Sequence, residues 1–467
     1  MFRTLMTSVA AAALATPLLA AGHAPLVVST DAATGPGSLS EALAQASAAT
    51  TPTTILITTE GDIALDATAT YDGAAPLTLI GRGQTLMANG DFTLLAIAQG
   101  ADVTIHALNF AGPGGFDIAN QSTGTPGKGI YVGVPQDATG TVTLTLQDVT
   151  VRDVAGHGIH LSDCSLADAC GAGAGGGGDG SAASISVMLN GVTVENAGHG
   201  NFDSDGVRVD ERGDGDIMFH ASASRFISVG ADGVELDEGD AGDVRVTSID
   251  NHYDLNGNYC DPAMVASFLP DPDEGEFEPG VLAEADAPGP VTGSPDDRCI
   301  EREVDLHDDG SIAEYAFGID LDDGFDVDEA GDGSIIATLT GGQIMNNTDE
   351  GLDFDEAGDG DITLTLVGAL AEGNTDDAIK LSEEDAGDVN VVATAITARA
   401  NGGKGIVLEE ADAGDLALTG VDLSTEANDD SDDTGLELVQ EDAGAGSATL
   451  IRANLSDGMD LDGVALP

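Results

Sequence analysis

The sequence predicts an all-β fold in which short strands and tight turns repeat along one axis as a solenoid. Three observations support this prediction. A six-residue segment occurs seven times, mostly at steps of 27 residues. Glycine is abundant, with 64 in a chain of 467 residues. Hydrophobic residues make up 42% of the chain although aromatic residues make up only 4%. An aliphatic core joined by many glycines favours sheets and sharp turns.

The charge of the chain excludes some functions. It has 14 basic and 83 acidic residues, which gives a formal net charge of −69 at pH 7. Such a chain cannot neutralise phosphates, so we expect no nucleic-acid partner, and docking on an anionic membrane surface is disfavoured. No later segment approaches the ~18 consecutive apolar residues of a membrane-spanning helix. We therefore expect no transmembrane segment.

Residues 1–24 have the pattern of a secretory signal peptide. Arg3 supplies the positive start, an apolar stretch runs from Leu5 to Ala21, and small residues before Ala24 offer cleavage points. We expect the mature protein to be secreted or periplasmic, and residues 25–467 to form a single domain.

The start of that domain predicts a short helix. Ser38 and Glu41 have the spacing of a capping box. The residues that follow place apolar side chains on one helix face: Leu39, Ala42, Leu43 and Ala46. A solenoid needs a cover at its open end, and this helix would provide it.

The repeat defines the rung of the solenoid. Within each copy, apolar residues at the second and fourth positions alternate with polar ones, which is typical of a strand. A glycine nine places after the first position recurs in every copy, so we expect a turn that needs either positive φ or close backbone approach. The copies start at Gly206, Gly233, Gly324, Gly351, Ala378, Gly405 and Gly435. The glycines are Gly215, Gly242, Gly333, Gly360, Gly387, Gly414 and Gly444.

An asparagine recurs near the end of five units. Because stacked amides can hydrogen-bond along an axis, the sequence predicts an asparagine ladder. Its members are Asn256, Asn347, Asn374, Asn401 and Asn428.

Two insertions interrupt the rungs, at residues 164–184 and 257–317. One step of the repeat is 91 residues, which the second insertion explains. Four cysteines permit three pairings. We favour the two local pairs, Cys164 with Cys170 and Cys260 with Cys299, because each would close one insertion in an oxidising compartment. The second insertion has the character of a lid or arm, although a tolerated insertion without function is equally compatible with it.

A 27-residue unit without a helical stretch is typical of one rung of a parallel β-solenoid. The chain resembles the right-handed parallel β-helix proteins of the pectate-lyase-like class. The segment 35–43, followed by residues 54–57, also looks like the first segment of secreted bacterial β-helix surface proteins. The resemblance covers most of the chain and implies the fold, but fold alone does not imply function.

In-register stacking would place acidic residues in two adjacent columns, one of aspartates and one of glutamates. Like carboxylates at the rung spacing repel by about 1 kcal/mol in water, and more when partly desolvated. Divalent cations, Ca²⁺ above all, would offset this repulsion. So would hydrogen bonds from the backbone of each turn, or screening in a salty habitat. The candidate metal ligands are Asp237, Glu238, Asp328, Glu329, Asp355, Glu356, Glu383 and Glu410.

The outward position of the first strand varies in charge, and we expect ion pairs between Arg208 and Glu235 and between Asp353 and Lys380. The pectate-lyase-like resemblance implies a second interpretation. Enzymes of that class combine acidic Ca²⁺ ligands with a basic residue that abstracts a proton, which makes Lys380 a candidate base. The acidic residues belong to the repeat itself, however, and a strongly acidic surface would repel polyuronate.

A histidine offers a second catalytic candidate. His199 lies in a Gly-His-Gly segment and is followed by Asp203 and Asp205, which resembles glycoside hydrolases of this fold that cleave polygalacturonate. The Arg-Ile-Lys segment of those enzymes is missing, and the order of the remaining motifs differs. A turn residue between glycines is the competing interpretation of His199.

The sequence therefore favours an extracellular structural or binding protein with a divalent-cation-binding face. The alternative is a Ca²⁺-dependent polysaccharide lyase or glycoside hydrolase. A polysaccharide or a cell-surface component is the expected partner in either case, and rods of this kind could also associate end to end.

Overall fold

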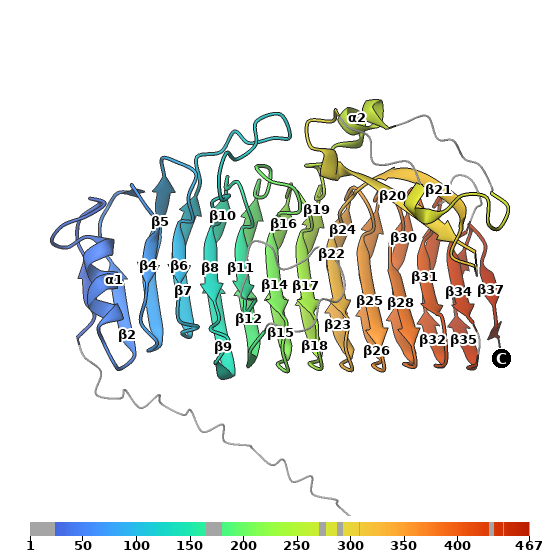
Figure 1. Ribbon diagram of the computed structural model, residues 1–467. Coiled ribbons are helices and arrows are strands. Elements are labelled where there is room, and N and C mark those ends of the chain that lie inside the picture. The colour runs from blue at the N-terminus through green and yellow to red at the C-terminus, as the bar shows by residue number, and fades with distance from the viewer. Residues whose placement is uncertain are drawn as a thin grey trace, which may run out of the picture.

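The protein is a right-handed parallel β-helix (Figure 1). The computed structural model describes residues 24–164, 180–269, 277–286, 293–307, 309–428, 434–441 and 443–466. The predicted signal peptide lies outside the described residues, apart from Ala24. Cys170, and with it the predicted Cys164–Cys170 pair, also lies outside them, as does most of the predicted insertion 164–184.

Each rung contributes strands to three faces. The first face is a sheet of twelve parallel strands: β4 (Ala69–Tyr71), β6 (Leu95–Ile97), β8 (Ile130–Gly133), β11 (Ile159–Ser162), β14 (Val207–Glu211), β17 (Val234–Glu238), β22 (Phe325–Glu329), β25 (Leu352–Gly358), β28 (Lys380–Asp385), β31 (Ile406–Glu410), β34 (Leu436–Gln440) and β37 (Asp460–Asp462).

The other two faces form one sheet of 24 strands, because β5 and β7 are long enough to belong to both. The second face comprises β1 (Leu26–Val28), β2 (Thr53–Ile57), β5 (Leu77–Ala88), β7 (Val103–Ala111), β9 (Thr139–Gln147), β12 (Ala182–Asn190), β15 (Ile217–Ser222), β18 (Val244–Ile249), β23 (Ile335–Thr340), β26 (Ile362–Val367), β29 (Val389–Thr394), β32 (Leu416–Val421), β35 (Gly446–Ile451) and β38 (Val464–Ala465). The third adds β3 (Ile63–Leu65), β10 (Thr150–Arg152), β13 (Thr193–Glu195), β16 (Arg225–Ile227), β19 (His252–Asp254), β24 (Gln343–Met345), β27 (Leu370–Glu372), β30 (Thr397–Arg399), β33 (Ser424–Glu426) and β36 (Asn454–Leu455).

The core runs along the inside of the solenoid. Phe325 and Val327 of β22 are fully buried and stack on Leu352 and Phe354 of the next rung. Aliphatic and aromatic residues alternate with polar ones along each strand, so every rung buries one side and exposes or pairs the other. This alternation is the strand pattern that the sequence predicts.

The predicted capping helix is present as α1 (Leu39–Ser47). Its N-cap residue, Ser38, accepts a hydrogen bond from the backbone N–H of Glu41 at 3.2 Å, and the Glu41 carboxylate accepts one from Gly37 at 2.6 Å. The four predicted apolar residues are buried against the N-terminal rungs. The helix covers that end of the solenoid (Figure 1). No helix within the described ranges has the length and apolarity to cross a membrane.

The asparagine ladder is confirmed. Each Nδ2 group donates to the Oδ1 atom of the asparagine in the next rung, and the four distances lie between 2.7 and 3.0 Å. The last member, Asn428, donates to Asp457 at 2.8 Å. The ladder crosses the 91-residue step without a break, because Asn256 bonds Asn347 at 3.0 Å.

The recurring turn glycines are explained by close backbone approach, the second of the two expected reasons. A Cβ atom at Gly360 would lie 1.4 Å from the carbonyl oxygen of Gly333, and one at Gly414 would lie 1.4 Å from that of Gly387. Neither glycine has positive φ. The rungs pack so closely at this turn that only hydrogen atoms fit between them.

The described part of the second insertion forms a short helix, three 3₁₀ turns and a hairpin. These are α2 (Pro262–Val265), η1 (Ala266–Phe268), η2 (Glu284–Asp286), η3 (Asp297–Cys299) and the antiparallel pair β20 (Ile300–Leu306) and β21 (Ile312–Ile319). The predicted disulfide between Cys260 and Cys299 is present and buried. It lies in a small apolar cluster with Tyr259 and Val265. The hairpin extends along one edge of the rungs (Figure 1).

Candidate functional site

The outward side of the twelve-stranded sheet carries the charged residues. In β14, Val207 and Val209 face the core, so Arg208 and Asp210 face outward. The register places Arg208, Glu235, Asp326, Asp353 and Lys380 in one column. A parallel column contains Asp210, Asp237, Asp328 and Asp355, which confirms the predicted alignment of the last three.

Arg208 anchors the N-terminal end of this charged surface. Its guanidinium donates to Asp210 at 2.8 Å, to Asp237 at 2.7 Å and to Glu235, which confirms the predicted ion pair with Glu235. Arg212 adds a second contact to Asp237 at 2.6 Å. Burial alone would lower the pKa of Arg208, but the surrounding carboxylates raise it well above its usual value. These two arginines neutralise only part of the carboxylates nearby.

Lys380 anchors the other end. Its Nζ atom lies 2.7 Å from Asp353 and 3.4 Å from Glu350, so the second predicted ion pair is also confirmed. Burial lowers the pKa of Lys380, and the carboxylates of Asp353, Asp355 and Glu350 raise it by more. The ammonium group therefore stays protonated, which argues against Lys380 as a base.

A cleft of about 400 Å³ lies between these two anchors. Among the described residues, thirteen acidic side chains line it, together with Lys380, Phe202 and Leu321. Glu301 of β20 comes from the insertion, and Asp320 and Asp322 belong to the segment that leads from β21 back to the rungs. The remaining acidic residues come from four successive rungs. The insertion and the segment that follows it therefore line one side of the cleft, and the rungs line the other.

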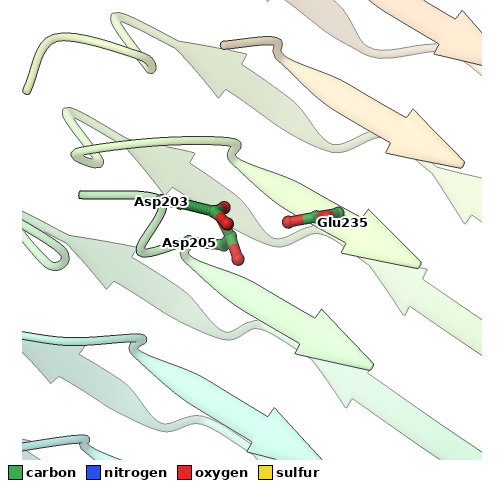
Figure 2. A group of neighbouring side chains, drawn as sticks. All are labelled: Asp203, Asp205 and Glu235. Atoms are coloured by element: carbon green, nitrogen blue, oxygen red, sulfur yellow. The ribbon is translucent and has the colours of Figure 1, made fainter. Parts of the chain in front are cut away.

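Four sets of three carboxylates within the described chain have oxygen atoms that all lie within 4.8 Å of one another. Figure 2 shows one set, in which Asp203 and Asp205 precede β14 and turn towards Glu235 on β17. Glu235 belongs to three of the sets. The sets are Asp203–Asp205–Glu235, Asp232–Glu235–Asp326, Glu235–Asp237–Asp328 and Asp323–Asp349–Glu350.

The sets differ in how far basic residues neutralise them. All three members of Asp203–Asp205–Glu235 contact Arg208. In Asp232–Glu235–Asp326 and Asp323–Asp349–Glu350, a single member of each set pairs with a basic side chain in the described chain. The negative charge is therefore least compensated at the centre of the cleft.

Burial is the largest cause of the raised pKa values of the carboxyl groups at the centre of the cleft. It raises the pKa of Asp232, Asp323 and Asp326 well above the usual range, and neighbouring carboxylates raise each one further. A buried carboxylate is stable only when it is protonated, paired or bound to a cation. The central groups thus need a proton or a cation, since no further basic side chain lines the described cleft.

Several buried oxygens have no hydrogen-bond donor among the described residues. Oδ1 of Asp323 and Oδ1 of Asp353 are two of them, and their side chains line the cleft. Asp323 and Asp353 are 9% and 8% exposed. Carboxylate oxygens without a donor are the kind of ligand that a hard cation accepts.

Of the eight predicted metal ligands, Asp237 and Asp328 belong to these sets, and Asp355 lines the cleft. The five glutamates belong to none of the sets. Glu238, Glu329, Glu356, Glu383 and Glu410 turn to the other side of the sheet at the strand ends. Each accepts a hydrogen bond from the backbone of its own turn, which is one of the two alternatives to cation binding that the sequence left open.

The predicted histidine does not join the aspartates that follow it. Nε2 of His199 lies 2.9 Å from Oδ1 of Asn258. A second Gly-His-Gly segment, residues 156–158, contains His157, and the Nδ1 atom of this histidine lies 3.1 Å from Oδ2 of Asp205. Asp203 and Asp205 do come together, as part of the set with Glu235.

Asp205 was named from the sequence, but the acidic residue that also directly precedes the first position of each of the next three repeat units was missed. Asp205, Asp232 and Asp323 stack in successive rungs, where the carboxylate of one accepts a hydrogen bond from the backbone of the next. Glu350 continues this line. The signal was present in the printed sequence as acidic residues directly before Gly206, Gly233, Gly324 and Gly351.

Fold and site together define a parallel β-helix protein with an acidic cleft on one face. No family model matches the chain, and no curated protein matches it. Among solved structures, the A-module of the Azotobacter vinelandii mannuronan C-5 epimerase AlgE4 is similar at 11% identity and a TM-score of 0.40, covering 94% of this chain and 95% of that one. A GH136 lacto-N-biosidase from Eubacterium ramulus is similar at 9% identity and a TM-score of 0.40, covering 86% of this chain and 64% of that one. At such scores these similarities define neither substrate nor activity here.

Proposed function

We propose that the protein is an exported binding protein whose acidic cleft takes up Ca²⁺. The observation that carries this proposal is the pair of under-compensated sets, Asp232–Glu235–Asp326 and Asp323–Asp349–Glu350, with oxygens within 4.8 Å. The buried disulfide supports an oxidising compartment.

The chemistry of these sets favours Ca²⁺ over other cations. All ligand atoms are carboxylate oxygens, whereas zinc sites favour cysteine and histidine. Ca²⁺ takes six to eight oxygen ligands in flexible geometry. Three carboxylates leave further coordination positions, which water or the oxygens of a bound ligand would occupy.

Bound Ca²⁺ would also change which ligands the cleft accepts. Without cations, carboxylates on both walls repel anions. With cations in place, hydroxyl or carboxylate oxygens of a saccharide or a cell-surface component would complete the coordination. We therefore propose cation-dependent binding of such a component as the role of the cleft.

Calcium-dependent lyase or hydrolase activity is the second candidate, since the cleft combines acidic groups with Lys380 and the pair Asp203 and Asp205. The protonated state of Lys380 weighs against the lyase mechanism. A polysaccharide panel assayed for unsaturated products and for reducing ends, with and without Ca²⁺, separates the two functions. Turnover of any polysaccharide would replace the binding proposal.

Calcium titration tests the cation site directly. Ca²⁺ that binds the folded chain only should stabilise it by about 2.7 kcal/mol per site at a hundredfold excess over Kd. Asp326→Asn should weaken this response, and the exposed residue Asp66 provides the matched control, Asp66→Asn. An unchanged melting curve in Ca²⁺, or an equal effect of sodium chloride at matched ionic strength, would contradict the proposal.

A further inference from the structure

A second acidic column runs along the inner side of the twelve-stranded sheet, and we refer to it as the glutamate ladder. Each member follows the alternating segment of its strand and lies in register with the glutamate of an adjacent rung. Every member is at least 99% buried. The members are Glu211, Glu238, Glu329, Glu356, Glu383 and Glu410.

One oxygen of each glutamate is held by its own turn. Oε1 of Glu356 accepts from the backbone N–H of Gly360 at 3.2 Å, and Oε1 of Glu383 accepts from Gly387 at 2.7 Å. Oε1 of Glu410 accepts from the equivalent glycine at 2.6 Å. The Oε2 atom of each of these three glutamates has no donor among the described residues. Buried oxygens without a donor are expensive, so something must lie between the rungs.

The charges around the C-terminal half of the ladder are all negative. Glu356 faces Glu329 and Glu383 in the adjacent rungs. Glu383 faces Glu356, Glu410 and Asp385. Glu410 lies near Asp412 and Asp388, and its next neighbour in register is the neutral Gln440. None of the described groups that act most strongly on these three glutamates is basic.

Burial and the neighbouring carboxyl groups both favour a bound proton. Burial is the larger cause, and together they raise the pKa of Glu356 to about 10 and that of Glu383 to about 7. The pKa of Glu410 is raised as well. No ladder glutamate belongs to a set of three carboxylates that could hold a metal ion among the described residues.

Gln440 shows that an uncharged side chain fits this position. It lies in register with Glu410, its Nε2 group donates to the carbonyl of Gly414 at 3.0 Å, and its Oε1 atom accepts from Leu416 at 2.8 Å. An amide and a protonated carboxyl group have nearly the same shape, and each has one donor side and one acceptor side. The chain thus already uses a neutral equivalent at one rung.

We propose that shared hydrogen ions, rather than metal ions, hold the glutamate ladder together, so that neighbouring carboxyl groups hydrogen-bond along the axis. The ladder is then a pH-dependent element of stability. The folded chain holds protons that the unfolded chain releases above the ordinary glutamate value of 4.5. Its contribution is complete below that value and is lost as the pH rises towards the folded values, about 7 for Glu383 and about 10 for Glu356.

Infrared spectroscopy of the full chain tests the proposal without reference to stability. Near neutral pH, protonated carboxyl groups show a carbonyl stretch that carboxylates lack. The difference between the parent and Glu356→Gln should contain this band, and the difference for the exposed control Glu195→Gln should not. Protonated groups in the cleft contribute equally to the spectra of the parent and the variant, so their bands cancel in the difference. Absence of the band from the Glu356→Gln difference would overturn the proposal.

Melting temperature against pH provides the second test. Glu383→Gln should flatten the decline in melting temperature between pH 5 and pH 8, and Gln440→Glu should steepen it. Glu356→Gln should leave the Ca²⁺ response of the parent unchanged, since the cleft lies on the other side of the sheet. Loss of that response in Glu356→Gln, together with an unaltered pH profile, would show that metal ions bind the ladder and would overturn the proposal.

Discussion

The acidic cleft and the glutamate ladder arise from the same strands, yet their carboxyl groups have different surroundings. Glu235 and Asp326 face outward into a cleft of about 400 Å³, which has room for a hydrated ion. Glu238 and Glu329 lie three residues further along each strand and face inward, against a turn glycine and the next glutamate. Solvent access, and not acidity, therefore decides whether a stacked carboxyl group is suited to a cation or to a proton.

Removal of Arg208 should have the largest effect and should act on the cleft alone. Arg208→Met leaves five carboxylates without their shared partner, and breaking a buried ion pair in this way costs about 3–5 kcal/mol. Denaturant unfolding should show this loss, and Ca²⁺ should restore part of it. The exposed residue Arg225 provides the control, Arg225→Met. If both variants lost the same amount of stability, the ion pairs of the buried Arg208 would contribute no more than an exposed arginine does, which would contradict this prediction.

Loss of the disulfide should affect the cleft and leave the glutamate ladder unchanged. Cys260→Ser combined with Cys299→Ser should destabilise the insertion by about 2–4 kcal/mol, because the bond closes a segment of 39 residues. Limited proteolysis should detect cleavage in the insertion, and Ca²⁺ affinity should fall because one wall of the cleft is freed. The infrared band of the glutamate ladder should persist. Undiminished Ca²⁺ affinity would show that the insertion does not contribute to the cation site.

The asparagine ladder serves as the uncharged counterpart of the glutamate ladder. Asn374→Ala removes hydrogen bonds to Asn347 and Asn401 and leaves buried groups without partners, which costs about 1–3 kcal/mol. Thermal unfolding should show the same loss at pH 5 and at pH 8, because amides do not titrate. The exposed control Asn390→Ala should have little effect. A loss in Asn374→Ala that changed with pH would mean that the two ladders are coupled.

Acid should act in opposite directions on the two regions. Protons compete with Ca²⁺ for carboxylates, so each proton displaced should lower the Ca²⁺ affinity by about 1.4 kcal/mol per pH unit as the pH falls. The glutamate ladder gains stability over the same range. Calorimetric titration at several pH values, compared with melting in chelator, checks both trends. A Ca²⁺ affinity that is independent of pH would contradict carboxylate ligation in the cleft.

The fold was predictable because its determinants are local and repeat. The alternation in 324–329, the glycine at position 333 and the asparagine at position 347 each recur at a fixed step, and repetition shows which residues stack. The capping helix was predictable for a related reason, since Ser38 and Glu41 interact within a single turn.

The site was only partly predictable, because its geometry depends on contacts between distant segments. The pattern places Glu356 next to Asp355, but only the structure shows that the glutamate bonds Gly360 while the aspartate lines the cleft. The wall formed by Glu301 and Asp320 could not be foreseen, since the path of the insertion follows from its disulfide and apolar cluster. The sequence favours His199 because Asp203 and Asp205 follow it closely, whereas the contact of His157 with Asp205 spans 48 residues.

The unbroken register across the 91-residue step has a consequence for how such a protein can be modified. Three strand pairs, β17–β22, β18–β23 and β19–β24, join the rungs on either side of the insertion as they do elsewhere. The scaffold therefore tolerates an excursion at this point without any change in its axial repeat. The two ends of the insertion, after β19 and before β22, are therefore a natural grafting point, where the arm can be exchanged as a cassette while the rod that carries it stays the same.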